Sequence, residues 1–170
     1  GPDSVTMQYI AYWEKRFTAH EFTVVHAAQQ QFLFEKSEAA FDGVMQKVAA
    51  ADFLIWAFPL YFLLVHSGYM RFIELIFERN KETVFKDKYS AAISTSIHFY
   101  DHTAHNYIHS ISDDLEMNYL GGIPAHMHDL TKTDVRRSLD ALFANWMESA
   151  IHKLPSNPAF APVQYTPNQL

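Results

Sequence analysis

Cysteine is absent from the 170-residue chain. This excludes disulfides, thiolate metal sites and iron–sulfur ligation within it, and it favours a cytoplasmic setting. Glycine is scarce, at five residues, and the chain has no Gly-x-Gly-x-x-Gly, no Walker-type phosphate loop and no Gly-x-Ser-x-Gly turn. The sequence therefore gives no support to a kinase, a Rossmann dehydrogenase or a serine hydrolase.

Long apolar runs and positive net charge are also lacking. The longest apolar run, residues 53–65, is interrupted by Pro59 and is too short to span a bilayer. The formal net charge of -6 gives no general attraction to nucleic acid. We therefore expect neither a membrane nor a nucleic acid as a partner.

Aromatic residues are abundant, at 15% of the chain, which suits a well-packed core or a site for a flat ligand. The length suits one domain. Residues 155–170 contain four prolines and little periodicity, so we expect a domain over residues 1–154 followed by a tail or linker over residues 155–170.

Helical and β-type segments alternate along the chain. We expect helices to begin near Ser4, Ser37, Ser67, Asp101 and Thr131, and strands at residues 22–27, 51–59, 89–97 and 118–125. Regular alternation favours a parallel sheet with helices on both faces. A chain of this kind usually begins with a strand, whereas this one begins with a helix.

Three segments, residues 51–61, 71–79 and 86–92, together resemble the flavodoxin-like NAD(P)H-dependent FMN reductase family. The shared pattern is a strand ending in Pro-x-Tyr, a helix ending in an acidic residue and Arg, and a strand after a Lys-containing turn. The resemblance runs from about Ser4 to Leu130. Residues 96–107 depart from the family's glycine-rich loop and look like a subgroup in which a second flavodoxin-like domain follows.

The resemblance implies an α/β fold with a doubly wound parallel sheet in three α/β/α layers, whose first, central strand is absent from this chain. Without that strand and most of its phosphate loop, we expect weak affinity for the FMN phosphate. We also expect an open slot in the sheet, with unpaired main-chain groups on both flanking strands. Upstream residues or a neighbouring chain are expected to fill it.

The best candidate site is Pro59, Leu60, Tyr61 and Phe62, just beyond the carboxyl end of a strand, where open α/β sheets bind ligands. From position alone, Pro59 could equally end the strand while Tyr61 packs on the next helix. The resemblance favours contact with a flavin ring.

Other candidates follow from helix starts and from the next strand. Ser4 and Thr6 could bind a phosphate at a helix amino end or could simply cap the helix. The resemblance places Thr95, Ser96 and His98 beside the flavin ring. His98 is a possible catalytic or substrate-guiding residue, or an exposed loop histidine.

Histidines are concentrated in the second half of the chain. Helical spacing places His102, His105 and His109 on one side of a helix, facing away from the core. A solvated face is our first interpretation, and a docking surface is the second. No metal is expected, with His105 and His109 as weak candidates for a metal pair.

Two functions remain open from the sequence. The first is an FMN-dependent oxidoreductase domain that passes electrons from NAD(P)H through flavin to an unknown acceptor. The second is a non-catalytic flavodoxin-like interaction or electron-relay domain of a larger protein. The expected partners are FMN, NAD(P)H, and either a second copy in a homodimer or a second domain of the same protein.

Overall fold

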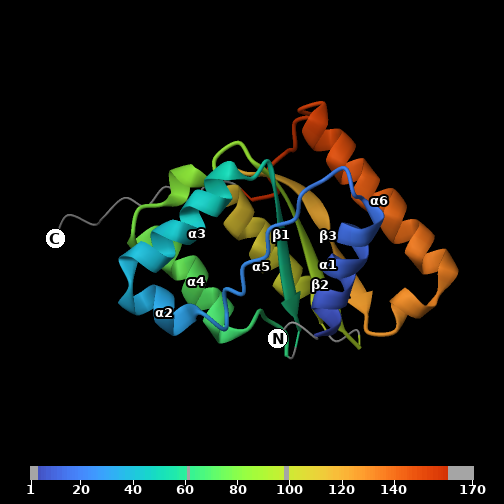
Figure 1. The fold of residues 1–170 in the computed structure, drawn as a ribbon, viewed down its shortest axis with the longest axis horizontal. Coiled ribbons are helices and arrows are strands. Elements are labelled where there is room, and N and C mark those ends of the chain that lie inside the picture. Colours follow the sequence, from blue (N-terminus) through green and yellow to red (C-terminus); the bar gives the residue numbers. More distant parts are fainter. Residues whose placement is uncertain (1–3, 61, 98–99, 161–170) are drawn as a thin grey trace.

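A three-stranded parallel sheet forms the centre of the molecule (Figure 1). The computed structural model describes residues 4–60, 62–97 and 100–160. The sheet order is β1 (Phe53–Pro59), β2 (Tyr89–Ser96) and β3 (Asn118–His126), all parallel. The expected parallel α/β architecture in three layers is confirmed.

Helices cover both faces of the sheet. They are α1 (Val5–Arg16), α2 (Gln31–Lys36), α3 (Glu38–Ala50), α4 (Ser67–Glu78), α5 (Asp101–Asp114) and α6 (Thr133–Ile151), with short 3-10 turns η1 (Glu82–Val84) and η2 (Asp129–Thr131). Helices α1 and α6 pack on one face, and α2 to α5 pack on the other. Among the described residues, no helix combines the length and apolarity needed to cross a bilayer.

Alternate side chains of β1 belong to the two different cores. Trp56 and Phe58 are buried against α3, α4 and α5, whereas Phe53 and Ile55 face α1 and α6. This period of two is what a strand between two helical layers requires. The run is apolar at successive positions because both of its faces are covered.

The core between α1 and α6 is built from aromatic rings. Trp13 lies 5.2 Å from Phe143 and 5.9 Å from Trp146, measured between ring centroids. All three side chains are buried. Their packing holds α1 against the sheet and therefore fixes where the amino end of α1 lies.

The expected strand at residues 22–27 is wrong. This segment has no regular secondary structure and pairs with no described strand. In the flavodoxin strand order, the second strand pairs only with the first. Because β-propensity without a partner does not form a ladder, residues 22–27 remain irregular.

Two of the five expected helix starts are confirmed. The hydroxyl oxygens of Ser4 and Ser37 accept hydrogen bonds from the N–H groups of Met7 and Ala40. In both helices the hydroxyl therefore satisfies one of the free N–H groups of the first turn.

The other three helices begin at or within two residues of the expected positions, but the expected caps are wrong. Helix α4 is capped by the His66 ring, and Ser67 is already its first residue. Asp101 is the first residue of α5 rather than its cap. Thr131 lies in η2, where its hydroxyl donates to the His128 carbonyl, so α6 begins at Thr133.

Candidate functional site

The carboxyl ends of β1, β2 and β3 meet at one edge of the sheet, and α1 begins at the same edge (Figure 1). The hydroxyl oxygens of Thr6 and Thr95 lie 2.6 Å apart, and both residues are buried. The Tyr9 hydroxyl donates to the His126 carbonyl at 2.7 Å. These contacts bind the first turns of α1 to the ends of β2 and β3.

Six candidates from the sequence line one cavity at this edge: Ser4, Thr6, Pro59, Leu60, Thr95 and Ser96. The main chain connects two of them, because the Leu60 N–H donates to the Thr95 carbonyl at 3.0 Å. Phe62 follows β1 but is not among the residues that line this cavity. Tyr61 and His98, the remaining two candidates, lie outside the described residues.

The amino end of α1 offers free main-chain donors. The Met7 N–H is bound by the Ser4 hydroxyl and the Gln8 N–H by the Ser4 carbonyl. The Val5 and Thr6 N–H groups have no acceptor among the described residues. Main-chain N–H groups and the partial positive charge of a helix amino end attract anions in general.

The predicted hydroxyl ligands are held by protein partners. The Thr95 hydroxyl is bonded to Thr6 rather than pointing into the cavity. The Ser96 hydroxyl donates to a carboxylate oxygen of Asp101 at 2.6 Å. These contacts fix the loop after β2, so the side chains of Thr95 and Ser96 act mainly by positioning it.

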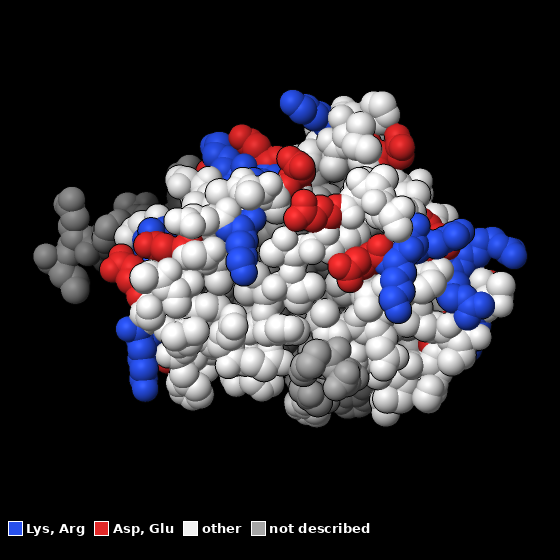
Figure 2. All heavy atoms as spheres, in the orientation of Figure 1, with Lys and Arg blue, Asp and Glu red and all other residues white. Residues whose placement is uncertain are grey.

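Exposed apolar side chains follow all three strand ends. Phe62 is 68% exposed after β1 and Ile97 is 70% exposed after β2, while Met127 is exposed after β3. Figure 2 shows that the described surface around the lower strand ends is largely uncharged in this view. A flat apolar molecule could therefore lie against this edge without displacing ionic groups.

The loop that carries Phe62 is tightly turned. The Leu64 N–H donates to the Phe62 carbonyl at 2.6 Å, and Leu63 has φ of 61°. A non-glycine residue in this region is strained by about 1–3 kcal/mol. Strain of this kind is common beside binding sites.

Burial and a neighbouring carboxylate keep Tyr9 protonated. Burial is the main cause, with the negative charge of Asp129 second, and together they raise the pKa of Tyr9 to about 12. Its hydroxyl therefore stays a donor to the His126 carbonyl over the physiological range. Tyr9 and Asp129 were missed from the sequence, because their meeting depends on how α1 packs across β3.

The expected orientation of the histidine stripe is wrong for His105. Its Nε2 lies 2.8 Å from the Ser94 hydroxyl, and its ring centroid is 5.9 Å from that of Phe58. Burial lowers the pKa of His105, against the opposing charge of Asp101. His105 reaches the sheet because Gly122 leaves room for its ring: a Cβ at Gly122 would collide with Nδ1 of His105.

His109 has aromatic rather than metal-like surroundings. Its ring lies 4.4 Å from the Tyr119 centroid and 5.4 Å from that of Phe160. Among the described residues, no group of three histidine or carboxylate side chains is arranged to hold a metal ion. His105 and His109 are each occupied by other contacts.

The chain resembles known proteins in sequence and in fold. The profile of a family described as NADPH-dependent FMN reductase matches residues 1–128. No curated protein matches the chain. Among solved structures, the apo form of an NADH:FMN oxidoreductase aligns with a TM-score of 0.70 at 14% identity, covering 88% of this chain and 84% of that one.

Two further solved structures share the fold. A protein from P. pentosaceus described as an NADPH-quinone reductase has a TM-score of 0.62 at 12% identity, with 86% and 89% of the two chains covered. A protein described as a flavone reductase has a TM-score of 0.58 at 12% identity, with 90% of this chain and 60% of that chain covered. At these identities the likeness establishes the fold.

Proposed function

Because the chain belongs to the NADPH-dependent FMN reductase family, we propose that it is a flavin-dependent oxidoreductase domain that binds FMN at the carboxyl edge of its sheet. The observation that carries this proposal is the meeting of α1, β1 and β2 at that edge, shown by the Thr6–Thr95 contact. Open parallel sheets bind their ligands at this edge.

The residues present suit the two ends of FMN. The N–H groups of Val5 and Thr6 at the amino end of α1, which have no acceptor among the described residues, suit the phosphate. Phe62 and Ile97 provide exposed apolar surface for the ring, and the loop after Leu60 can supply main-chain N–H donors to its heteroatoms. When bound, FMN supplies the hydride chemistry, accepting from NAD(P)H and passing electrons onward.

The protein's own task is then to bind and orient the ring. The contacts of Thr95 and Ser96 hold the loop after β2 in place, and the buried Thr6 holds the end of α1 beside it. None of these described side chains needs to exchange a proton during hydride transfer. The site is therefore mainly a binding site, with His98 retained as the candidate for guiding substrate.

Titration with FMN tests the proposal. We expect tag-free protein to bind FMN, and NADH or NADPH to bleach the bound flavin anaerobically. Phe62→Ala should weaken FMN binding about 10-fold, equivalent to ~1.4 kcal/mol, because it removes an aromatic surface. The matched control is Phe32→Ala on α2, which removes an equally exposed ring, 69% against 68%.

Two outcomes contradict the proposal. One is a protein that binds no FMN at any tested concentration although it is folded. The other is an equal loss of affinity in Phe62→Ala and Phe32→Ala, which would place the flavin elsewhere. Reduction by one nicotinamide nucleotide in preference to the other then identifies the hydride donor.

The proposal extends to assembly. A second flavodoxin-like domain following the tail, or a homodimer, would bring another surface to the exposed apolar edge around Phe62 and Ile97. The residues that begin the tail lie on α5, since the Ala159 and Phe160 N–H groups donate to the Asp113 carboxylate. Sedimentation of the full-length protein checks whether it associates.

A further inference from the structure

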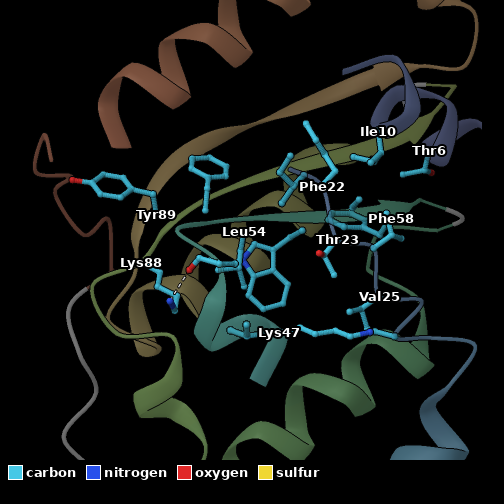
Figure 3. A pocket seen from close by; sticks show the side chains of 18 of the residues that line it. Thr6, Ile10, Phe22, Thr23, Val25, Lys47, Leu54, Phe58, Lys88 and Tyr89 are labelled. Atoms are coloured by element: carbon cyan, nitrogen blue, oxygen red, sulfur yellow. Dashed lines mark hydrogen bonds between the residues drawn. The ribbon is translucent and has the colours of Figure 1, made fainter. Parts of the chain in front are cut away.

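A second cavity, of about 330 Å³, lies between α5 and the outer edge of β3. We call it the β3 pocket. Its described lining comes from His102, His105, Asn106 and His109 on α5 and from Tyr119, Gly121, Gly122 and Pro124 on β3. Figure 3 shows the lining of the other, larger cavity, which includes the proposed flavin site, and the two cavities have no lining residue in common. The β3 pocket is therefore a separate place on the molecule.

Two polar atoms of the β3 pocket lack hydrogen-bond partners. Tyr119 is only 8% exposed, yet its hydroxyl has no partner among the described residues. The Nδ1 atom of His105 is buried and also has no partner in the described part of the chain. Both atoms lie beside Gly122, because a Cβ placed there would collide with Nδ1 and would lie 2.9 Å from the Tyr119 hydroxyl oxygen. A buried polar group without a partner costs about 1–3 kcal/mol, so this arrangement favours a bound polar ligand.

Side chains on both sides of the β3 pocket can donate hydrogen bonds to such a ligand. Burial raises the pKa of Tyr119, so its hydroxyl keeps the proton and remains a donor at neutral pH. The Tyr119 ring is held by the His109 ring, at 4.4 Å between centroids. On α5, His102, Asn106 and His109 lie at positions i, i+4 and i+7 and share one face of the helix. Imidazole and carboxamide groups both carry N–H donors.

The main chain of β3 adds a donor at Gly122. The Met127 N–H donates to the Ser96 carbonyl of β2. One residue earlier, the His126 N–H donates to Asp129 on the outer side of the sheet. Alternate residues of a parallel strand bond to opposite sides, and the register with β2 is regular from Gly122 to His126, so the Gly122 N–H also points outwards. Gly122 is exposed and has no side chain to cover this group.

The charges around the β3 pocket favour an anion. Its described lining contains no carboxylate. Two acidic residues of α5 lie nearby but are bonded to other groups. Asp101 accepts a hydrogen bond from a hydroxyl of the loop after β2. Asp113 accepts from the Ala159 and Phe160 N–H groups, and its other oxygen lies 3.7 Å from Nε2 of His109. The charge that the lining itself can carry is the positive charge of protonated imidazole.

We propose that the β3 pocket binds one tetrahedral oxyanion of the phosphate or sulfate class. The Tyr119 hydroxyl and the Gly122 N–H bind it from the side of β3, and His102 and His109 bind it from the side of α5. Single donors from two sides suit a tetrahedral anion, whereas a planar carboxylate is best held by the paired donors of an arginine. A free anion and a phosphate ester share this chemistry. The inference does not depend on FMN or on the proposed function.

A titration with sodium sulfate, followed residue by residue in NMR spectra of the 170-residue chain, tests the proposal. Sodium chloride keeps the ionic strength constant. Sulfate keeps its double charge between pH 6 and pH 8, so a change in affinity over this range reports the protein. We expect saturable shifts at the Gly122 amide and at Tyr119, with a Kd on the order of 1 mM. Binding should be about 10-fold tighter at pH 6 than at pH 8, because imidazoles gain a proton over this range.

Two variants separate the hydroxyl from the charge. Tyr119→Phe keeps the ring that packs on His109 and should weaken sulfate binding about 5-fold. His102→Gln keeps a hydrogen-bond donor without the charge and should reduce the gain in affinity between pH 8 and pH 6. The matched control is His152→Gln on α6, whose imidazole pairs with Glu148 and lines neither cavity, and it should change neither quantity. Unchanged affinity in folded Tyr119→Phe would overturn the proposal.

Further titrations identify the source of the oxyanion. Adenosine 5′-monophosphate binding more tightly than sulfate would support the proposal with a phosphate ester as the ligand, and the reverse order would support it with a free anion. Adenosine binding as tightly as its monophosphate would overturn it. Shifts confined to Val5 and Thr6, with none at Gly122, would assign sulfate to the end of α1 and overturn it as well. Failure to bind FMN, with sulfate binding at Gly122 intact, would contradict only the proposed function.

Discussion

The two edges of the sheet are built in opposite ways. On the outer edge of β3, Pro124 has no N–H group, and the His126 N–H donates to the Asp129 carboxylate at 2.9 Å. A register shift interrupts its pairing with β2. On β1, seven successive residues pair regularly with β2 and include no charged side chain.

This difference indicates that the β3 edge suits lasting exposure to solvent and that the β1 edge does not. Natural sheets blunt their exposed edges with prolines, bulges and charges, because a free regular edge invites pairing with another chain. The β3 edge has the first two of these devices. The β1 edge has only Pro59, at its last position, so it has the features of an interior strand.

The largest effect should come from the side chains that tie β1 to the helices behind it. Trp56→Ala removes a ring that stacks on Phe85 at 6.1 Å and should lower the free energy of unfolding by about 3–5 kcal/mol. Ile55→Ala, whose half-buried side chain faces α1 and α6, should cost roughly 1–2 kcal/mol. Urea unfolding measures both. Equal losses would mean that β1 is packed as tightly against α1 and α6 as against α3 to α5.

A smaller effect is expected on β3, where Gly122 faces His105. Gly122→Ala should lower stability by about 1–3 kcal/mol, since its Cβ would collide with the His105 ring. Gly43→Ala in α3 is the control: nothing lies near its Cβ, so it should gain roughly 0.5–1 kcal/mol. Adding His105→Ala to Gly122→Ala should restore part of the loss. No restoration would show that the collision is not the cause.

Removing Pro124 should make the outer edge of β3 available for pairing with another chain. Pro124→Val adds an N–H to the outer side of β3 and should change stability by no more than about 0.5 kcal/mol. It should increase concentration-dependent association, which sedimentation velocity measures. If association is unchanged while the fold is intact, Pro124 does not protect that edge.

The smallest effect is a pH dependence. Burial lowers the pKa of His105 below its ordinary value, so the unfolded chain binds the extra proton first as pH falls. Stability should therefore be fully present above about pH 6.5 and decline below it. His105→Asn should reduce this decline relative to wild type, whereas His102→Asn, at an exposed position, should not. Thermal melts between pH 5 and 8 compare the three, and identical slopes would contradict the burial of His105.

The sequence predicted the parallel sheet well because β1 is apolar on both faces and β1 and β2 alternate regularly with α4 and α5. It failed at residues 22–27, where β-propensity is high but no partner strand is present. Propensity is local, whereas pairing depends on a second segment. Helix α2 was missed because six residues with no side-chain cap give little periodic signal.

The candidate site was predicted in position but not in contacts. Open parallel sheets bind ligands at the carboxyl ends of their strands, and this rule placed Ser4, Leu60 and Thr95 together because it depends only on strand direction. It could not show that the Thr95 hydroxyl is bonded to Thr6 or that His105 turns inward. The second of these depends on the glycine at position 122, whose role is visible only when the ring beside it is placed.

The most direct test of the open edge is amide exchange along β1 in the 170-residue chain alone. We predict a period of two: slow exchange at Leu54, Trp56 and Phe58, which bond to β2, and fast exchange at Phe53, Ile55 and Ala57, whose N–H groups point away from β2. Uniformly slow exchange at all six amides, at a concentration where the chain is monomeric, would contradict the open edge.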